Sequence, residues 1–332
     1  MGSKPLKTAV VVTAEFEAIW PYVADHLRQE LGGDSAVQTV RVPAGQDTPL
    51  PELITAPAQV ERLIALGIDL GETELDALPA LVEVVASLGY QEPPGLAPAA
   101  AARGIRLVTH ESEGFWGQSV AEFALGLTIA ALRRIPQRHH QLIAGPDPWQ
   151  YPAEQYADDP RFSSGTVQGK RVRIVGAGNV ASRYAAFTHA LGADVAAWDP
   201  YAAEPAFDRA GSRREHFLDR LIEDAEIFAP MVPLTDGTRG LVDADLLRRL
   251  PSGCLVVLAT RAAVVDVAEL RRRVTADELS LAADVFDVEP LPPHDPLIGR
   301  DNVVHTPHLA GRTKEANLRW ATMLLDRFSD HR

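Results

Sequence analysis

Cysteine, methionine and aromatic residues are scarce in this chain. Its 332 residues include one cysteine, three methionines and 6% aromatic residues. A single cysteine cannot form an internal disulfide, and Cys254 lies in the apolar run GCLVVLA, where we expect a buried strand residue rather than a reactive thiol. This cysteine usage favours a reducing, cytoplasmic compartment. We predict no bound metal.

Long hydrophobic runs and an excess of basic residues are also missing. We expect no apolar segment that spans a bilayer, and MGSKPLKTAVVVTAE lacks the apolar core of a signal peptide because its short apolar stretch runs into acids. The net charge is −13, with 32 Lys and Arg against 45 Asp and Glu, which argues against a nucleic-acid partner. The length allows two domains with full cores.

The clearest motif lies in Arg171–Asp199, which predicts a strand, a glycine turn, an amphipathic helix and a second strand ending in an acid. Gly176 permits the tight turn, and Gly178 lets the backbone approach a pyrophosphate. The first turn of the helix offers unpaired N–H groups to an anion. Asp199, 21 residues beyond Gly178, is placed to accept hydrogen bonds from an adenosine ribose.

These residues predict a site for NAD. The third glycine of the motif is replaced by Ala181, a variant that still allows close helix–strand packing. A carboxylate at Asp199 repels a 2′-phosphate, and no arginine follows immediately, so NAD is favoured over NADP. The alternative is an ordinary βαβ turn in some other α/β domain.

Apolar strand candidates alternate with helical segments along most of the chain, which predicts an α/β fold with doubly wound parallel sheets. One long helix is expected over Ser119–Ala144, and an irregular connection over Gly145–Gly169. The strand candidates are Lys7–Thr13, Val82–Ala86, Val172–Gly176, Asp194–Trp198, Ala225–Val232, Cys254–Ala259, Leu281–Phe286 and Asn302–Thr306.

Chemically active side chains follow three of these strands. Arg261 comes after the strand of Cys254, Glu289 follows the strand that carries Asp284, and His308 follows the last strand. In open α/β sheets, ligands bind beyond the carboxyl ends of strands. A guanidinium can grip a carboxylate, an imidazole can move a proton, and a carboxylate can orient that imidazole. Taken singly, Arg261, Glu289 and His308 could also be a surface arginine, a solvated acid and a structural histidine.

Three ordered segments closely resemble the D-isomer-specific 2-hydroxyacid dehydrogenases. They are PLTDGTRGLVDADLLRRLPSGCLVVLATRAAVVD, AADVFDVEPLPPHDPL and NVVHTPHLAGRTKEA, within a similarity that runs from about Ser119 to Ala316. The resemblance implies two Rossmann-like domains, with the NAD domain (113–308) inserted into a discontinuous substrate-binding domain (1–112 plus 309–332). It also implies an active site between the domains and homodimers formed through the NAD domain.

The resemblance also implies roles for individual residues. Arg261, Glu289 and His308 match the catalytic residues, and Asp284 matches an aspartate that contacts nicotinamide. Leu88, Gly89 and Arg261 match substrate-binding positions. The expected cofactor-binding positions are Gly176, Gly178, Asn179, Val180, Asp199, Val232, Pro233, Thr238, Ala259, Thr260 and Asp284.

The chain departs from the family pattern at the substrate side. The usual Asn-Thr-x-Arg-Gly is Leu258-Ala259-Thr260-Arg261-Ala262, and the usual Gly-x-Gly-x-Asp loop keeps only Gly89 within Ser87–Pro93. The following loop, His110–Gly117, is about two residues longer than usual. Tyr90, Phe115 and Trp116 suggest a bulky substrate pocket, but they are equally consistent with packing between domains.

The leading hypothesis is an NAD-dependent oxidoreductase that interconverts a 2-keto acid and a D-2-hydroxy acid. The partner would be that small acid, with no nucleic acid and no membrane. Two alternatives remain. One is a phosphite or formate dehydrogenase of the same fold, although the formate enzymes carry glutamine in place of Glu289. The other is a non-catalytic NAD-sensing protein like the corepressors of this family.

Overall fold

The computed structural model describes residues 7–46, 48–89, 92–110, 114–145 and 158–329. The chain divides into two compact units: residues up to Phe115 together with those from Thr313 onward, and Trp116–Arg312. These boundaries lie a few residues beyond those expected from the sequence. The N-terminal unit is therefore built from two separate parts of the chain, with the second unit inserted between them.

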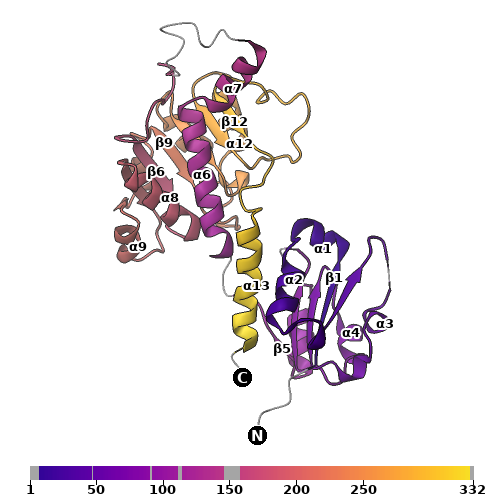
Figure 1. Ribbon diagram of the computed structural model, residues 1–332. Helices are drawn as coiled ribbons and strands as arrows, with labels where there is room; N and C mark the ends of the chain where they lie inside the picture. Colours follow the sequence, from indigo (N-terminus) through magenta and orange to yellow (C-terminus); the bar gives the residue numbers. More distant parts are fainter. Residues whose placement is uncertain (1–6, 47, 90–91, 111–113, 146–157, 330–332) are drawn as a thin grey trace. The chain divides into compact units, whose positions relative to one another are not determined.

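The first unit is built on a five-stranded parallel sheet in the order β2-β1-β3-β4-β5. Strand β1 lies inside the sheet, between β2 and β3, and is almost fully buried because its valines face helices on both sides. Figure 1 shows these helices around the sheet. The strands are β1 (Thr8–Thr13), β2 (Val37–Val42), β3 (Arg62–Leu66), β4 (Glu83–Ser87) and β5 (Arg106–Leu107). The helices are α1 (Ala14–Ile19), α2 (Val23–Glu30), α3 (Leu50–Leu53), α4 (Glu72–Asp76), α5 (Leu96–Ala102) and α13 (Lys314–Ser329).

Helix α13 joins this unit although it lies at the far end of the sequence. It packs beside α2, and Trp320 lies with its ring centroid 5.6 Å from that of Trp20. At its other end, Arg62 donates to the Phe328 carbonyl and Arg106 to the Arg327 carbonyl. Both arginines also pair with Glu83, whose side chain is only 5% exposed. Glu83 thus fixes the two side chains that cap the helix.

The second unit contains a seven-stranded parallel sheet in the order β12-β11-β10-β9-β6-β7-β8. The sequence order reverses between β6 and β9, which creates the crevice where doubly wound folds bind ligands. The strands are β6 (Arg171–Val175), β7 (Asp194–Trp198), β8 (Arg213–Arg214), β9 (Ile227–Pro230), β10 (Leu255–Leu258), β11 (Ser280–Ala283) and β12 (Val303–His305). The helices are α6 (Gly117–Leu132), α7 (Ile135–Ala144), α8 (Asn179–Ala190), α9 (Glu204–Arg209), α10 (Leu218–Leu221), α11 (Ala244–Arg249) and α12 (Val267–Thr275).

Alternate residues of this sheet enter two separate core layers. In β10, Leu255 and Val257 pack into the layer that contains α6 and α8, whereas Val256 and Leu258 pack into the layer that contains α11 and α12. This is the period-two alternation of a strand covered on both faces. In Figure 1, α6 and α8 lie together over one face of the sheet. The predicted α/β class with doubly wound parallel sheets is confirmed.

The structure corrects one predicted helix. The sequence predicts a single helix over Ser119–Ala144, but α6 ends at Leu132 and α7 begins at Ile135. Arg134 between them has φ +52°, and Pro136 occupies the first turn of α7. Because a proline cannot continue a preceding helix, the chain turns here and starts a new one.

A second expectation concerned membrane-spanning segments. By length and composition alone, Gly114–Leu132 could cross a membrane, contrary to the expectation that no apolar run reaches that length. Within the second unit, this segment contains α6, where Val120, Ala121 and Ala124 are buried in the core. The apolar composition of this segment is therefore explained by α6 being a core helix that packs one side on the sheet.

Candidate active site

The carboxyl ends of β10, β11 and β12 lie in register at one edge of the second sheet. Leu258 pairs with Ala283, which pairs with His305, so these three residues form a row across the strands. Arg261 follows three residues after the first of them, and His308 three residues after the last. The sheet therefore brings these two predicted residues to a common edge, as the strand pattern indicated.

His308 is held against Glu289. Its Nδ1 atom lies 2.7 Å from Oε2 of Glu289, while Oε1 of the same carboxylate accepts a 2.8 Å hydrogen bond from the Phe286 N–H. An ionised carboxylate only accepts hydrogen bonds, so Nδ1 carries the proton and Nε2 is the nitrogen left for chemistry. The imidazole side chain is 48% exposed, which leaves it accessible to a ligand. The Glu289–Pro290 peptide bond is cis.

Asp284, immediately beyond β11, anchors the loop that carries His308. Its side chain is fully buried, and both oxygens are occupied. Oδ1 accepts from the Thr306 hydroxyl at 2.6 Å and the Leu309 N–H at 3.0 Å, and Oδ2 accepts from the Ala310 N–H at 2.8 Å. Between these anchored positions His308 has φ +51°, a left-handed conformation that is uncommon for residues other than glycine, although histidine adopts it more often than most. A direct contact of Asp284 with a nicotinamide stays a prediction.

Arg261 is exposed at the edge of the sheet. Its Nη1 donates a 2.8 Å hydrogen bond to the carbonyl of neighbouring Thr260. No carboxylate among the described residues forms an ion pair with it. An unpaired guanidinium retains the donors that match a carboxylate in a bidentate arrangement. This arrangement is what a substrate-binding arginine requires.

The glycine turn of the second unit has the shape expected for a dinucleotide site. Gly176 has φ +110°, and a Cβ placed on it would lie 2.8 Å from the carbonyl oxygen of Met231 at the neighbouring strand. Gly178 precedes α8, and a Cβ there would meet nothing within 4 Å. The backbone at Gly178 therefore faces open space at the N-terminus of α8. Ala181 is 1% exposed, in agreement with its predicted packing role.

Asp199 closes this turn from the end of β7. One oxygen accepts from the Ala177 N–H at 2.9 Å, and the other accepts from the N–H groups of Tyr201 and Ala202. The sequence predicted an acceptor for ribose hydroxyls but not these backbone bonds. The carboxylate thus fixes the glycine turn as well as presenting negative charge beside it, which is unfavourable for a 2′-phosphate.

The other expected cofactor positions fall at the same edge of the sheet. Val232 and Pro233 follow β9, and the Thr238 hydroxyl donates to the Pro233 carbonyl at 2.5 Å, which ties this loop together. Ala259 is buried beyond β10, and the Thr260 hydroxyl donates to the Pro230 carbonyl at 3.2 Å. Asn179 and Val180 open α8, and Asn179 accepts two hydrogen bonds from Arg183.

The predicted substrate residues Leu88 and Gly89 lie in the first unit, directly beyond β4. Gly89 has φ +88°, and its carbonyl accepts from the Ser87 hydroxyl at 3.2 Å. Leu88 is 38% exposed. Tyr90 and the start of the longer loop after His110 lie outside the described residues.

Of the three aromatic residues suggested for a substrate pocket, Phe115 packs within the first unit. Phe115 is 5% exposed, and its ring lies 6.0 Å from Trp20 and 5.1 Å from His110. The ring centroid of Trp320, on α13, lies 5.0 Å from that of His110. Burial, with a smaller contribution from Arg327, lowers the pKa of His110 to about 4. These rings are therefore part of a hydrophobic cluster that contains a neutral histidine.

Sequence reasoning missed the arginines that organise the site. Arg183 reaches back one helical turn to Asn179, and Arg271 on α12 pairs with two acids of the loop that carries Glu289. The (i, i+4) spacing of Asn179 and Arg183 could have indicated the first contact. No local pattern could have indicated the second, because its partners are 16 and 24 residues away.

These features define a dinucleotide-binding unit with a histidine–carboxylate pair at its sheet edge. Residues 125–310, more than half of the chain, match the family model described as "D-isomer specific 2-hydroxyacid dehydrogenase, NAD binding domain". The chain belongs to the D-isomer specific 2-hydroxyacid dehydrogenase family, and its second unit is the NAD-binding domain of that family. The family resemblance predicted from the sequence is confirmed.

Individual proteins similar to this chain have names that belong to the same family. The chain is 34% identical over 201 residues to a D-3-phosphoglycerate dehydrogenase of Archaeoglobus fulgidus, a match covering 60% of this chain and 36% of that protein. It is 34% identical over 236 residues to a glyoxylate reductase of Thermofilum pendens, covering 68% of this chain and 65% of that protein. A D-lactate dehydrogenase of Treponema pallidum has the same fold, with a TM-score of 0.71, 21% identity and coverage of 96% of this chain and 95% of that chain.

Proposed function

We propose that this chain is an NAD-dependent oxidoreductase that interconverts a 2-keto acid and a D-2-hydroxy acid. The observation that carries the proposal is the 2.7 Å contact between His308 Nδ1 and Glu289 Oε2, at the same sheet edge as Arg261, which has no carboxylate partner among the described residues. An imidazole oriented by a carboxylate is suited to proton transfer, and a free guanidinium is suited to an acid substrate.

The residues of the second unit fit NAD. Gly176 has no room for a side chain, Gly178 faces open space, and the N–H groups of the first turn of α8 are available to a pyrophosphate. Asp199 supplies the carboxylate expected beside the adenosine ribose, and the loop of Val232, Pro233 and Thr238 lies on the adenine side. Asn179, Val180, Ala259, Thr260 and Asp284 complete the proposed set.

Bound NADH supplies a hydride to C2 of the keto acid, and NAD⁺ accepts it in the reverse direction. His308 donates a proton from Nε2 to the oxygen on C2 during reduction, and takes it back during oxidation. Glu289 keeps the proton of the resting imidazole on Nδ1 and stabilises the charged form. Arg261 binds the carboxylate and polarises the carbonyl, and the backbone amides at Leu88 and Gly89 contribute to substrate binding. Asp284 positions the loop of His308.

The remaining parts of the proposal are a cytoplasmic location and a homodimer formed through the second unit, with no membrane or nucleic-acid partner. The family resemblance and the single buried cysteine support them. Light scattering after size-exclusion chromatography tests the dimer, since a monomer at micromolar concentration contradicts it.

A substrate panel tests the activity. NADH oxidation is followed by absorbance with phenylpyruvate, hydroxypyruvate and 2-ketoisocaproate, and NADH formation is followed with phosphite and formate. Turnover of a keto acid to the D-hydroxy acid supports the proposal. Turnover confined to phosphite or formate, or tight NADH binding without any turnover, contradicts it and favours one of the alternatives.

A variant of His308 tests the mechanism. His308→Asn is the informative change because asparagine tolerates the left-handed backbone found here. It removes the acid–base group, so kcat is expected to fall by about 10²–10⁴-fold while the Kd for NADH stays within about twofold. Wild-type turnover by this variant on the best substrate contradicts the role of His308.

A further inference from the structure

The loop between β11 and β12 carries Glu289. Arg271, which lies outside this loop, forms ion pairs with one loop residue before Glu289 and one after it. Arg271 lies on α12, and its Nη2 is 2.8 Å from Oδ1 of Asp287, two positions before Glu289. Its Nη1 lies 3.0 and 2.9 Å from the two oxygens of Asp295, six positions after Glu289. One guanidinium therefore spans the segment that holds the proposed orienting carboxylate.

The ion pair between Arg271 and Asp295 is better protected than an ordinary surface pair. The Asp295 side chain is 7% exposed and that of Arg271 21% exposed, whereas Asp287 is 37% exposed. Asp295 also accepts a 2.9 Å hydrogen bond from the Leu297 N–H, and Leu297 is buried in the core. Burial lowers the pKa of Arg271, but its hydrogen bonds to the two acids outweigh this and raise the pKa overall. Low exposure strengthens such pairs and makes loss of one partner costly.

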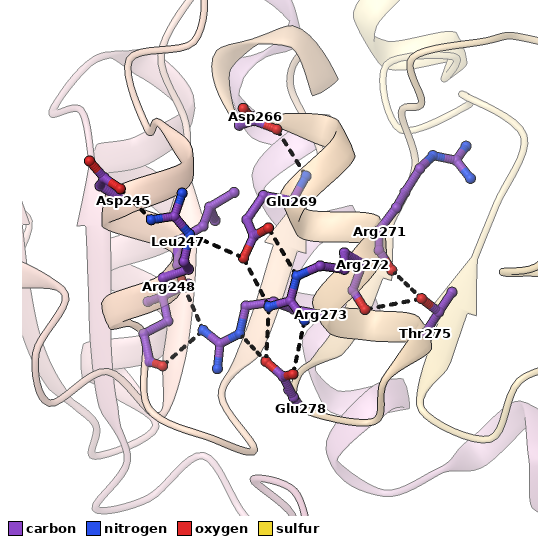
Figure 2. A network of polar contacts seen from close by, with 11 residues as sticks. Asp245, Leu247, Arg248, Asp266, Glu269, Arg271, Arg272, Arg273, Thr275 and Glu278 are labelled. Atoms are coloured by element: carbon purple, nitrogen blue, oxygen red, sulfur yellow. Dashed lines mark hydrogen bonds and ion pairs between the residues drawn. The ribbon is translucent and has the colours of Figure 1, made fainter.

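The two following arginines of α12 serve a different purpose. Arg272 pairs with Glu269 and Glu278, and Arg273 pairs with Glu278 and donates to backbone carbonyls. Figure 2 shows this network, with the Arg271 guanidinium pointing away from it on the other side of the helix. Arg272 is thus a matched control: it is the adjacent residue, of the same type, and has two carboxylate partners, but among the described residues it forms no hydrogen bond or ion pair with the loop of Glu289.

We propose that Arg271 is a positioning residue for the acid–base pair, acting through the loop on Glu289 and thereby on His308. The proposal rests on the proposed function. Its two ion pairs fix Asp287 and Asp295, the loop between them places Glu289, and the Glu289 carboxylate keeps its hydrogen bond to His308 Nδ1. Without Arg271, the loop has more freedom, and the carboxylate spends less time at hydrogen-bonding distance from the imidazole.

The experiment compares Arg271→Met with Arg272→Met in the full-length protein. Methionine keeps an unbranched apolar stem and removes the charge in both. The first readout needs no substrate: a proton on Nδ1 that is hydrogen-bonded to a carboxylate gives a low-field imidazole resonance in the proton NMR spectrum. That resonance is assigned by its loss in His308→Asn. We expect Arg271→Met to lose or broaden it and Arg272→Met to keep it.

The second readout is kinetic. Arg271→Met is expected to lower kcat by about tenfold, a part of the total contribution of acid–base catalysis, with the KM for NADH within about twofold. Its pH–rate profile should move in the same direction as that of Glu289→Gln. The profile of Arg272→Met should coincide with wild type. Arg271→Lys should restore only part of the activity, because an ammonium cannot reproduce the two-sided guanidinium fork.

The possible results distinguish failure of the Arg271 proposal from failure of the proposed function. A folded Arg271→Met with the low-field resonance, kcat and pH–rate profile of wild type overturns the proposal. If Arg271→Met does not fold, Asp287→Asn removes only the more exposed pair, and the same loss of resonance is then expected. If the wild-type protein turns over none of the hydroxy or keto acids, the proposed function fails, but the resonance still tests whether Arg271 holds the pair together.

Discussion

His308 Nδ1 and Glu289 Oε2 lie 2.7 Å apart although 19 positions separate them in the chain. The two residues belong to separate loops that follow the neighbouring strands β11 and β12. Each loop has its own anchor: Asp284 for the His308 loop and Arg271 for the Glu289 loop. The contact therefore depends on two sets of interactions, and Asp284, at the start of the loop that carries Glu289, joins the two loops directly.

The first prediction concerns the charge of Glu289. In Glu289→Gln the amide oxygen can still accept from Nδ1, but the negative charge that favours the imidazolium is gone. The pH–rate profile for keto-acid reduction should move toward lower pH. Steady-state rates between pH 5 and 9 measure it. Glu223→Gln, a change of an exposed acid paired with Arg249, is the control. An unmoved profile for Glu289→Gln contradicts the pairing.

The second prediction concerns Asp284. Asp284→Asn keeps the size of the side chain but turns one acceptor into a donor, which cannot receive the N–H of Leu309 or Ala310. Losing a hydrogen bond to a charged group costs roughly 1.5–3 kcal/mol, so the His308 loop should loosen and kcat should fall by tenfold or more. Stopped-flow measurement of a single turnover checks this.

The control for Asp284 is Asp245→Asn, an exposed acid on α11 that pairs only with Arg248 among the described residues. It should leave turnover unchanged. If Asp284→Asn is fully active and folded, the loop does not need its anchor. If only its affinity for NADH falls, the direct contact with nicotinamide is the better explanation of this residue.

The third prediction concerns cofactor choice. Asp199→Ala removes both the charge that disfavours a 2′-phosphate and the acceptor of the Ala177 N–H. The Kd for NADH should rise about tenfold, the equivalent of one lost hydrogen bond to a charged group, and the preference for NADH over NADPH should narrow. Fluorescence titration with each cofactor measures both effects. Asp208→Ala on α9 should change neither, and an undiminished preference in Asp199→Ala argues against the assigned role.

The sequence supports the architecture of the second unit well because its parallel strands are short, apolar and separated by helices. All six strands expected there are present, and the residues after three of them lie at one sheet edge. The strand pattern was weaker in the first unit. Strand β2, VQTVRV, lies at the edge of its sheet with its middle residues only partly buried, so it lacks the continuous apolar run that marked the strands of the second unit.

The interactions that position the site could not be predicted from sequence, for a physical reason. Asp199, Asp284 and Arg271 each bind partners that are distant in the chain or are backbone atoms, and no residue spacing indicates such contacts. The break before α7 has a local cause in Pro136, but the apolar residues on both sides continue the helical period and concealed it.

The fourth prediction concerns the attachment of α13. Glu83 is 5% exposed and binds Arg62 and Arg106, which in turn cap the last carbonyls of α13. Glu83→Gln removes the charge and leaves two arginines near each other without their shared partner. Breaking a buried pair from one side costs about 3–5 kcal/mol, so the free energy of unfolding measured in urea should fall by an amount of this order.

Glu315→Gln is the control for Glu83, since this acid lies in the first turn of α13 and is exposed. It should change stability by less than about 0.5 kcal/mol. Hydrogen exchange of the α13 amides gives a local readout. If Glu83→Gln is as stable as wild type and α13 exchanges no faster, the arginines hold the helix without help from the carboxylate.

The fifth prediction concerns acid stability and His110. Burial among Phe115 and Trp320 lowers the pKa of this histidine to about 4 in the folded protein, below its usual 6.5. Between these two pH values the unfolded chain binds a proton that the folded chain does not. Stability is therefore unaffected above about pH 6.5 and falls as the pH drops toward 4, by at most about 3 kcal/mol.

His110→Phe tests this directly. Neither ring nitrogen has a hydrogen-bond partner among the described residues, so phenylalanine replaces the ring without leaving a polar group unsatisfied. The variant should be at least as stable as wild type at pH 7 and should lose less stability between pH 6.5 and 4.5 in urea titrations. His216→Phe, a change of an exposed histidine in the second unit, should keep the wild-type pH dependence. Wild type and His110→Phe share every other titratable group, so the difference between their slopes of unfolding free energy against pH isolates His110. Equal slopes would mean that this histidine is protonated as readily in the folded chain as in the unfolded one.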